Sequence, residues 1–124
     1  MIPLIIFLGL TGAAQAAGAE SSPADVERGR KIFATCAACH RDAAEEVPNP
    51  GPNLQGVFGR PAASVPGFRY SRALRNAKRT WTEENLFEFL GDPQAALPGN
   101  TMPFPGLPDE AQRRDLIVFL KTLQ

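Results

Sequence analysis

The sequence predicts an all-α domain in which three main helices and some short ones are joined by long loops. Apolar residues recur at helical spacing in two segments, 26–33 near the start and 116–123 at the end. No strand of consequence is predicted, and 12 prolines and 11 glycines among 124 residues imply long irregular connections. Such a loop-rich domain buries little apolar surface, so we expect a staple, a metal or a cofactor to complete its core.

The first main helix is expected to begin at Ser22 as N-cap, with Pro23 in its first turn and Asp25 near the positive end of the helix dipole. One face of this helix holds Val26, Gly29, Ile32 and Phe33. Core packing accounts for this apolar face without any functional role.

The remaining helices follow a loop over residues 48–64, where four prolines disfavour helix. A short helix is predicted over residues 71–77. Thr82 should cap a helix over residues 83–91, with Glu83 and Glu84 in its first turn and Gly91 at its end. The last helix should start near residues 108–109, and its apolar stripe consists of Leu116, Ile117, Phe119, Leu120 and Leu123.

The N-terminus is typical of a secretory signal peptide. The apolar run IPLIIFLGL is followed by small residues and by Ala14-Gln15-Ala16, an A-x-A cleavage pattern. We therefore expect residues 1–16 to be a signal peptide cleaved near Ala16, residues 17–22 to be a short extension, and residues 23–124 to form the mature domain. This predicts a periplasmic protein with no stable membrane insertion. The alternative is a retained anchor, because the apolar or small residues from Ile2 to Gly18 reach the lower limit of a membrane span.

The overall charge argues against one class of partner. Thirteen basic residues balance 13 acidic ones, so nothing in the composition indicates a protein that binds nucleic acid or another polyanion. The length indicates a single domain.

The only two cysteines and the only histidine lie within five residues, in Cys36-Ala-Ala-Cys39-His40. A disulfide across two intervening residues would close too short a loop to stabilise the fold much. A thioredoxin-like pair would need a preceding strand, whereas the residues before Cys36 are helical in pattern, and a zinc site would need more ligands. The remaining interpretation is covalent attachment of one haem c, for which C-x-x-C-H is the signal.

The spacing suits this chemistry. Residues three apart on a helical turn face the same side, so both sulfurs can reach the vinyl groups of one porphyrin while His40 directs an imidazole nitrogen at the iron. Met102 is the only methionine left once Met1 is removed with the signal, and its thioether is a soft ligand for the other face of the iron. It lies in the proline-stiffened stretch LPGNTMPFPGLP, and filling a core gap is its ordinary alternative role.

Taken together, these motifs resemble class I cytochromes c, and most closely the subgroup shared by mitochondrial carriers and bacterial periplasmic ones. The resemblance rests on six stretches in family order from Gly29 to Leu120: GRKIFATCAACH, GPNLQGVFGR, PGFRYS, TW, PGNTMPF and DLIVFL. It implies the cytochrome c fold wrapped around one covalent haem, with His40 and Met102 as axial ligands. It also implies that the first and last helices cross where Gly29 lets Leu116 and Phe119 approach.

The resemblance gives roles to five more residues. The Pro52 carbonyl would accept a hydrogen bond from the ligating imidazole, and Phe104 would shield the exposed haem edge. A buried haem propionate would meet Arg60, Tyr70 and Trp81, since a carboxylate removed from water needs a cation or several donors. The alternatives are an ordinary turn proline for Pro52 and a core side chain for Trp81.

The sequence also departs from this family. Phe89 replaces a tyrosine that would bond the methionine sulfur, Leu74 replaces an asparagine, and Asn100 replaces a threonine on the methionine loop. Each change alters a polar contact near the methionine and so acts on the reduction potential. Basic residues cluster in FRYSRALRNAKRT, which a solvated face explains. Uncharged residues stand where mitochondrial relatives carry lysines around the haem edge: Thr35, Gln94, Ala95 and Thr101.

The function implied by the resemblance is that of a periplasmic monohaem electron-transfer protein, a mobile one-electron carrier and not an enzyme. Its partners would be a bc1-type donor and an oxidase, photosynthetic reaction centre or reductase as acceptor, besides the haem attachment machinery. Each redox partner would meet the haem edge in a small, transient interface. Two alternatives stay open. One is a small-ligand sensor or peroxidase-like enzyme with a labile Met102, and the other is a fixed cytochrome subunit of an oxidoreductase.

Overall fold

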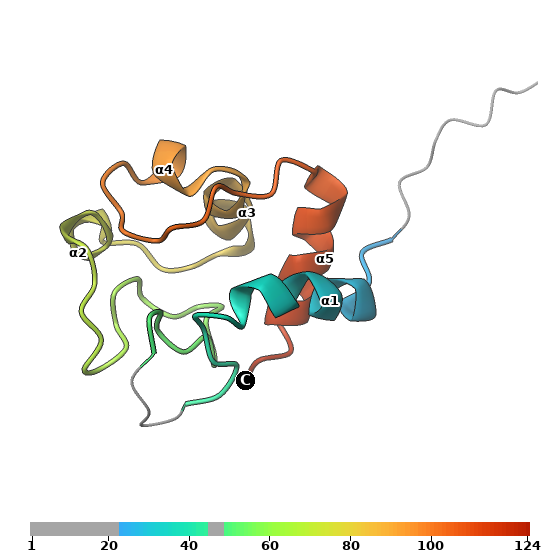
Figure 1. The fold of residues 1–124 in the computed structure, drawn as a ribbon, viewed down its shortest axis with the longest axis horizontal. Coiled ribbons are helices and arrows are strands. Elements are labelled where there is room, and N and C mark those ends of the chain that lie inside the picture. Colours follow the sequence, from blue (N-terminus) through green and yellow to red (C-terminus); the bar gives the residue numbers. More distant parts are fainter. Residues whose placement is uncertain (1–22, 45–48) are drawn as a thin grey trace, which may run out of the picture.

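The computed structural model describes residues 23–44 and 49–124, and it is helical as predicted (Figure 1). Its helices are α1 (Val26–Cys36), α2 (Arg72–Ala77), α3 (Glu83–Gly91), α4 (Pro93–Ala96) and α5 (Glu110–Leu120). Among the described residues, β pairing is limited to an isolated bridge between Pro61 and Thr80. The predicted signal peptide, its cleavage near Ala16 and the extension over residues 17–22 lie outside the described residues. Within 23–44 and 49–124, no helix has the length and apolar character needed to cross a membrane.

α1 begins three residues later than the sequence predicted. Asp25 is its N-cap, because the Asp25 carboxylate accepts the Arg28 backbone N–H at 2.7 Å. Ser22, the predicted cap, lies outside the described residues. Pro23 therefore precedes the helix, where its carbonyl accepts a hydrogen bond from the Arg28 guanidinium at 2.7 Å. An aspartate cap both satisfies a free N–H and places negative charge at the positive end of the helix dipole.

The later main helices start where predicted, each directly after a polar N-cap: Ser71 for α2, Thr82 for α3 and Asp109 for α5. The Thr82 cap is reciprocal. The Thr82 hydroxyl accepts the Asn85 backbone N–H, and the Asn85 side-chain oxygen accepts the Thr82 backbone N–H at 2.8 Å. α4 was not predicted, because four residues are too few to show a helical period. Asp92 caps α4 by accepting the Ala95 N–H at 3.1 Å.

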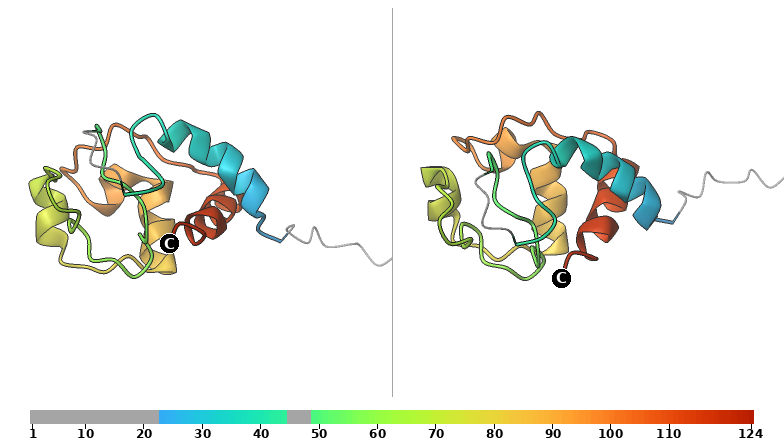
Figure 2. Two further views of the ribbon diagram at one scale, coloured as in Figure 1. Left: turned by 90° about the horizontal axis from the view of Figure 1, so that it is seen from below. Right: turned by 60° about the horizontal axis from the view of Figure 1, so that its bottom comes forward.

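α1 and α5 cross at the end of the molecule farthest from α2 (Figures 1 and 2). Gly29 lies at the crossing, where a side chain would collide with the Asp115 carbonyl and would bring its Cβ within 2.8 Å of Phe119 Cβ. The predicted approach of Phe119 to Gly29 is therefore confirmed, but Asp115, rather than Leu116, brings its backbone nearest. The Phe33 and Phe119 rings pack beside this contact with centroids 5.0 Å apart.

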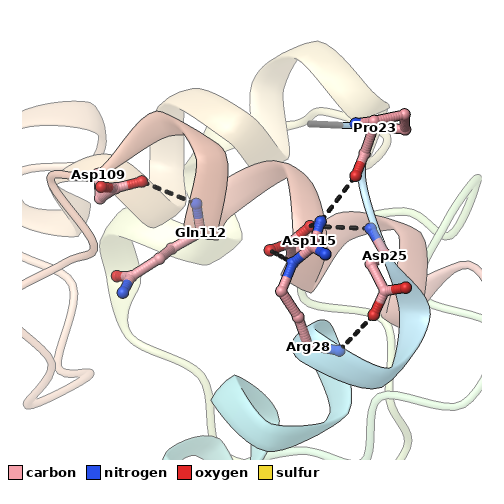
Figure 3. Close-up of polar contacts among 6 residues, drawn as sticks. All are labelled: Pro23, Asp25, Arg28, Asp109, Gln112 and Asp115. Carbon is pink, nitrogen blue, oxygen red and sulfur yellow. Dashed lines mark hydrogen bonds and ion pairs between the residues drawn. The ribbon is translucent and has the colours of Figure 1, made fainter. Parts of the chain in front are cut away.

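A buried carboxylate also ties the start of α1 to α5 (Figure 3). Asp115, only 6% exposed, accepts hydrogen bonds from Arg28 Nε at 2.9 Å, from Arg28 Nη2 at 3.1 Å and from the Asp25 N–H at 2.8 Å. The Arg28 hydrogen bond is the main reason why the pKa of Asp115 lies below its usual value, and the same bond raises the pKa of Arg28. The fold thus stabilises the ionised carboxylate, which couples the helix pairing to pH.

Gly29→Ala should destabilise the protein by about 1–3 kcal/mol, because the added methyl group must push α5 away from α1. Helix propensity alone predicts the opposite sign, since alanine is favoured over glycine by about 1 kcal/mol within a helix. Denaturant unfolding of the ferric protein measures the effect. Lys31→Ala, an exposed change on the same helix, is the control. A Gly29→Ala variant as stable as the wild type would contradict the close crossing.

Asp115→Asn should lower the free energy of unfolding at neutral pH. It should also make this free energy fall less as the pH is lowered. Because the folded-state pKa of Asp115 is depressed, its contribution is present above the unfolded pKa of the carboxylate and is lost as the pH falls through the folded pKa. Wild type and variant should therefore converge in stability as the pH is lowered. Glu110→Gln, an exposed carboxylate on the same helix, is the control. Parallel stability curves for Asp115→Asn and the wild type would contradict the assignment.

Candidate functional site

A cavity of about 420 Å³ lies within the described structure, with a mainly apolar wall. The end of α1, the loop that leads to α2, α3, the segment after α4 and α5 all contribute to this wall. The structure brings to it every site residue that the sequence singled out. The nine are Cys36, Cys39, His40, Pro52, Arg60, Tyr70, Trp81, Met102 and Phe104.

Cys36 and Cys39 are both held on the cavity wall by the turn that ends α1. Cys36 is the last residue of α1, and its carbonyl accepts the Cys39 N–H at 3.0 Å and the His40 N–H at 2.9 Å. Cys39 thus lies in a hydrogen-bonded turn beyond the helix, not on the helical turn that the sequence predicted. Burial raises the pKa of the Cys36 thiol. Two half-buried thiols on one apolar wall are available to the two vinyl groups of a porphyrin.

The His40 imidazole is oriented by two contacts from the loop. Its Nδ1–H donates to the Pro52 carbonyl oxygen at 2.7 Å, which leaves the Nε2 lone pair free for a metal. Gly51 packs flat against the ring, since a Cβ there would lie 2.7 Å from His40 Cε1 and 2.9 Å from Nδ1. Burial lowers the pKa of His40, although the Pro52 hydrogen bond acts in the other direction. The neutral, ligating form is therefore favoured.

Met102 lines the same cavity from a segment that has no regular secondary structure. Its backbone N–H donates to the Asn100 side-chain oxygen at 3.0 Å. Leu74 and Phe89 line the cavity as well, so two of the predicted departures place apolar groups on its wall. Phe89 packs against Trp81 with ring centroids 5.2 Å apart.

The Arg60 side chain has a buried N–H group without a hydrogen-bond acceptor in the described structure. Its Nη1 donates to the Gln55 carbonyl at 3.0 Å, whereas its Nε is buried and has no hydrogen-bond partner in the described structure. Burial lowers the pKa of Arg60 and raises that of Tyr70, whose hydroxyl accepts the Val65 N–H at 2.9 Å. A desolvated cation with a free donor fits a carboxylate such as a haem propionate. The residues present therefore fit a haem.

The sequence did not predict the contact of Gly51 with the His40 ring, nor the hydrogen bonds that the Asn100 side chain makes. The Gly-Pro pair at residues 51–52 was the available signal for Gly51, since a glycine next to a ligand-orienting proline allows close backbone approach. Asn100 was recognised only as an unusual residue. Its bonding depends on α4, which the sequence did not predict.

A sequence model of the family described as Cytochrome c matches residues 26–124 of the chain. The chain belongs to the cytochrome c family. Cytochrome c of Chlamydomonas reinhardtii is 45% identical to it over 104 residues, which cover 83% of this chain and 93% of that protein. Cytochrome c2 of Rhodoblastus acidophilus is 42% identical over 96 residues, covering 77% and 90%. The structure of cytochrome cH from Methylobacterium extorquens matches with a TM-score of 0.73 and 39% identity, covering 79% of this chain and 98% of that one.

This cytochrome has the predicted fold and carries covalent haem c, with Cys36 and Cys39 at the attachment spacing. The family consists of electron-transfer proteins, so the prediction that the chain is not an enzyme is confirmed as well. The family assignment favours covalent haem attachment over the disulfide and zinc interpretations of Cys36 and Cys39.

Proposed function

We propose that this cytochrome is a mobile one-electron carrier whose haem iron is bound by His40 and Met102. The observation that carries the proposal is that His40, fixed by Pro52, and Met102 line the same apolar cavity. Haem c supplies an iron that takes up and releases one electron. His40 and Met102 would each supply one ligand to this iron, which would leave no position for a substrate.

The protein part of the mechanism is to keep this site unchanged between oxidation states. The Pro52 hydrogen bond and the Gly51 backbone hold the His40 ring in one orientation. The mainly apolar wall would limit the contact of the bound haem with water, which reorganises around a changing charge. As a ligand, the Met102 thioether would favour the ferrous state and raise the reduction potential. Arg60, with its free Nε, would bind a propionate beside Tyr70 and Trp81, and Phe104 would cover the exposed haem edge.

The sequence supports a periplasmic location for this carrier. The apolar N-terminal run and the Ala14-Gln15-Ala16 pattern support removal of residues 1–16 and a mature domain over residues 23–124. The carrier would then shuttle between a bc1-type donor and an oxidase, reaction centre or reductase. Its haem would be attached by the export-side machinery.

A redox partner would dock on the edge of the cavity, where the residues predicted to contact it are uncharged; we call these residues, Thr35, Gln94, Ala95 and Thr101, the rim. Thr35 and Thr101 are exposed and line the cavity, and Gln94 and Ala95 are exposed on α4. Four exposed basic residues, Arg69, Arg72, Arg75 and Lys78, lie on and around α2, at the other end of the molecule from α1 and α5 (Figures 1 and 2). Exposed basic residues also lie on α1 and α5, among them Lys31 and Arg114. Weak charge at the rim implies weak electrostatic steering of a partner.

Met102→Ala should remove the thioether–iron charge-transfer band of the ferric protein and open the ferrous iron to carbon monoxide. The reduction potential should fall by about 0.1–0.3 V, within the range of about 0.8 V that axial ligands span. Optical spectra and a potentiometric titration measure these changes. Leu107→Ala, a half-buried apolar change in the same segment, controls for simple loosening. If the wild type lacks the band and binds carbon monoxide rapidly, the protein is a ligand sensor or a peroxidase-like enzyme instead.

Electron transfer at the exposed edge should depend weakly on salt. With hexacyanoferrate(III) and with a cationic cobalt(III) oxidant, the rate should change by less than about threefold between ionic strengths of about 0.01 and 0.15 M. Stopped-flow oxidation of the ferrous protein measures both slopes. A lysine ring would give steep slopes of opposite sign with the two reagents, and that result would contradict the uncharged rim.

A further inference from the structure

Asn100 is buried at 6% exposure on the cavity wall, two residues before Met102. Every polar atom of its carboxamide has a partner within the protein. Nδ2 donates to the Pro93 carbonyl and to the Leu97 carbonyl, both at 2.8 Å. Oδ1 accepts the Met102 backbone N–H at 3.0 Å. One side chain therefore connects the first residue of α4, Pro93, and its C-cap, Leu97, to the backbone of Met102.

The Asn100 backbone is fixed as firmly as its side chain. Its N–H donates to the Leu97 carbonyl at 3.1 Å, and its carbonyl accepts from Gln94 Nε2 at 2.8 Å. Between Leu97 and Asn100, Pro98 and Gly99 have the residue types of a type II turn, and Gly99 has the positive φ of 88° that such a turn requires. Asn100 is thus anchored to α4 by main chain and side chain together.

Only one orientation of the Asn100 carboxamide gives all of its polar atoms a hydrogen-bond partner. Rotation by half a turn would place its oxygen against two carbonyl oxygens and its amide hydrogens against the Met102 N–H. Neither a threonine hydroxyl nor an aspartate carboxylate supplies two donors and an acceptor in this arrangement. An outward movement of Met102 must break the bond to Asn100 Oδ1 and leave a buried acceptor unpaired, which opposes the movement.

We propose that Asn100 is a positioning residue that holds Met102 in place for the iron and limits the opening of this segment. The inference rests on the proposed ligation by Met102. A ferric haem protein binds an external ligand only in the fraction of molecules whose own ligand has left the iron, so its apparent affinity reports the opening equilibrium. Asn100 should keep this fraction small.

The test is binding of imidazole to the ferric holoprotein, followed by loss of the thioether–iron band. Asn100→Ala should raise the apparent imidazole affinity by about tenfold, and hydrogen exchange at the Met102 amide should accelerate by a similar factor. Asn100→Asp keeps the volume of the side chain but loses both donors, and it should act in the same direction. It also keeps the test decisive if the alanine variant folds poorly.

Asn85→Ala is the matched control. The Asn85 carboxamide also joins two backbone groups, the Thr82 N–H and the Thr80 carbonyl, but at the start of α3. Asn85→Ala should lower global stability while leaving imidazole affinity within about twofold of the wild type. Equal effects at Asn85 and Asn100, or wild-type affinity in both Asn100 variants, would overturn the positioning role alone. A wild type without the thioether–iron band would overturn the proposed function as well.

Discussion

The fold depends on the need to enclose an apolar porphyrin in a domain with little core of its own. Among residues 23–44 and 49–124, seven of the eleven buried core residues also line the haem cavity: Val57, Trp81, Leu86, Phe89, Leu90, Leu116 and Leu120. These side chains form the protein's interior and the wall of the site at the same time. The prosthetic group is therefore part of the hydrophobic core, which explains how so loop-rich a chain keeps a defined structure.

Two rigid parts hold this wall in position. The crossing of α1 and α5 at Gly29, tied by the buried Asp115, sets where α1 ends and hence where Cys36 lies. α4 and its attached residue Asn100 set where Met102 lies. The loop between α1 and α2 brings the Pro52 carbonyl within hydrogen-bond distance of the His40 ring.

The sequence predicted the main helices and the haem attachment motif because each left a local signal. The roles of Pro52, Arg60, Tyr70, Trp81 and Phe104 came only from the resemblance to the family and stay predictions. Thr82 and Asp109 cap helices in a recognisable way, and the Cys36–His40 motif allows few chemistries. The start of α1 was misplaced because serine and aspartate are both good caps, and the sequence does not show the tertiary bonds that Asp25 and Arg28 make to Asp115.

α4 and the bonding of Asn100 had no such signal. A four-residue helix shows no period, and a carboxamide that bridges Pro93, Leu97 and Met102 depends on how the chain folds back on itself. The same holds for Gly51, whose importance comes from the imidazole that lies against it. Contacts of this kind are set by three-dimensional arrangement and not by residue type alone.

The proposed function depends on one haem that is attached at Cys36 and Cys39 and whose iron is bound by His40 and Met102. X-ray absorption at the iron edge of the purified protein can identify the atoms bound to this iron. We expect one sulfur neighbour, beside the nitrogens of the porphyrin and the imidazole, in both the ferric and the ferrous state. An iron with only nitrogen and oxygen neighbours, or a sulfur neighbour lost on oxidation, would contradict it.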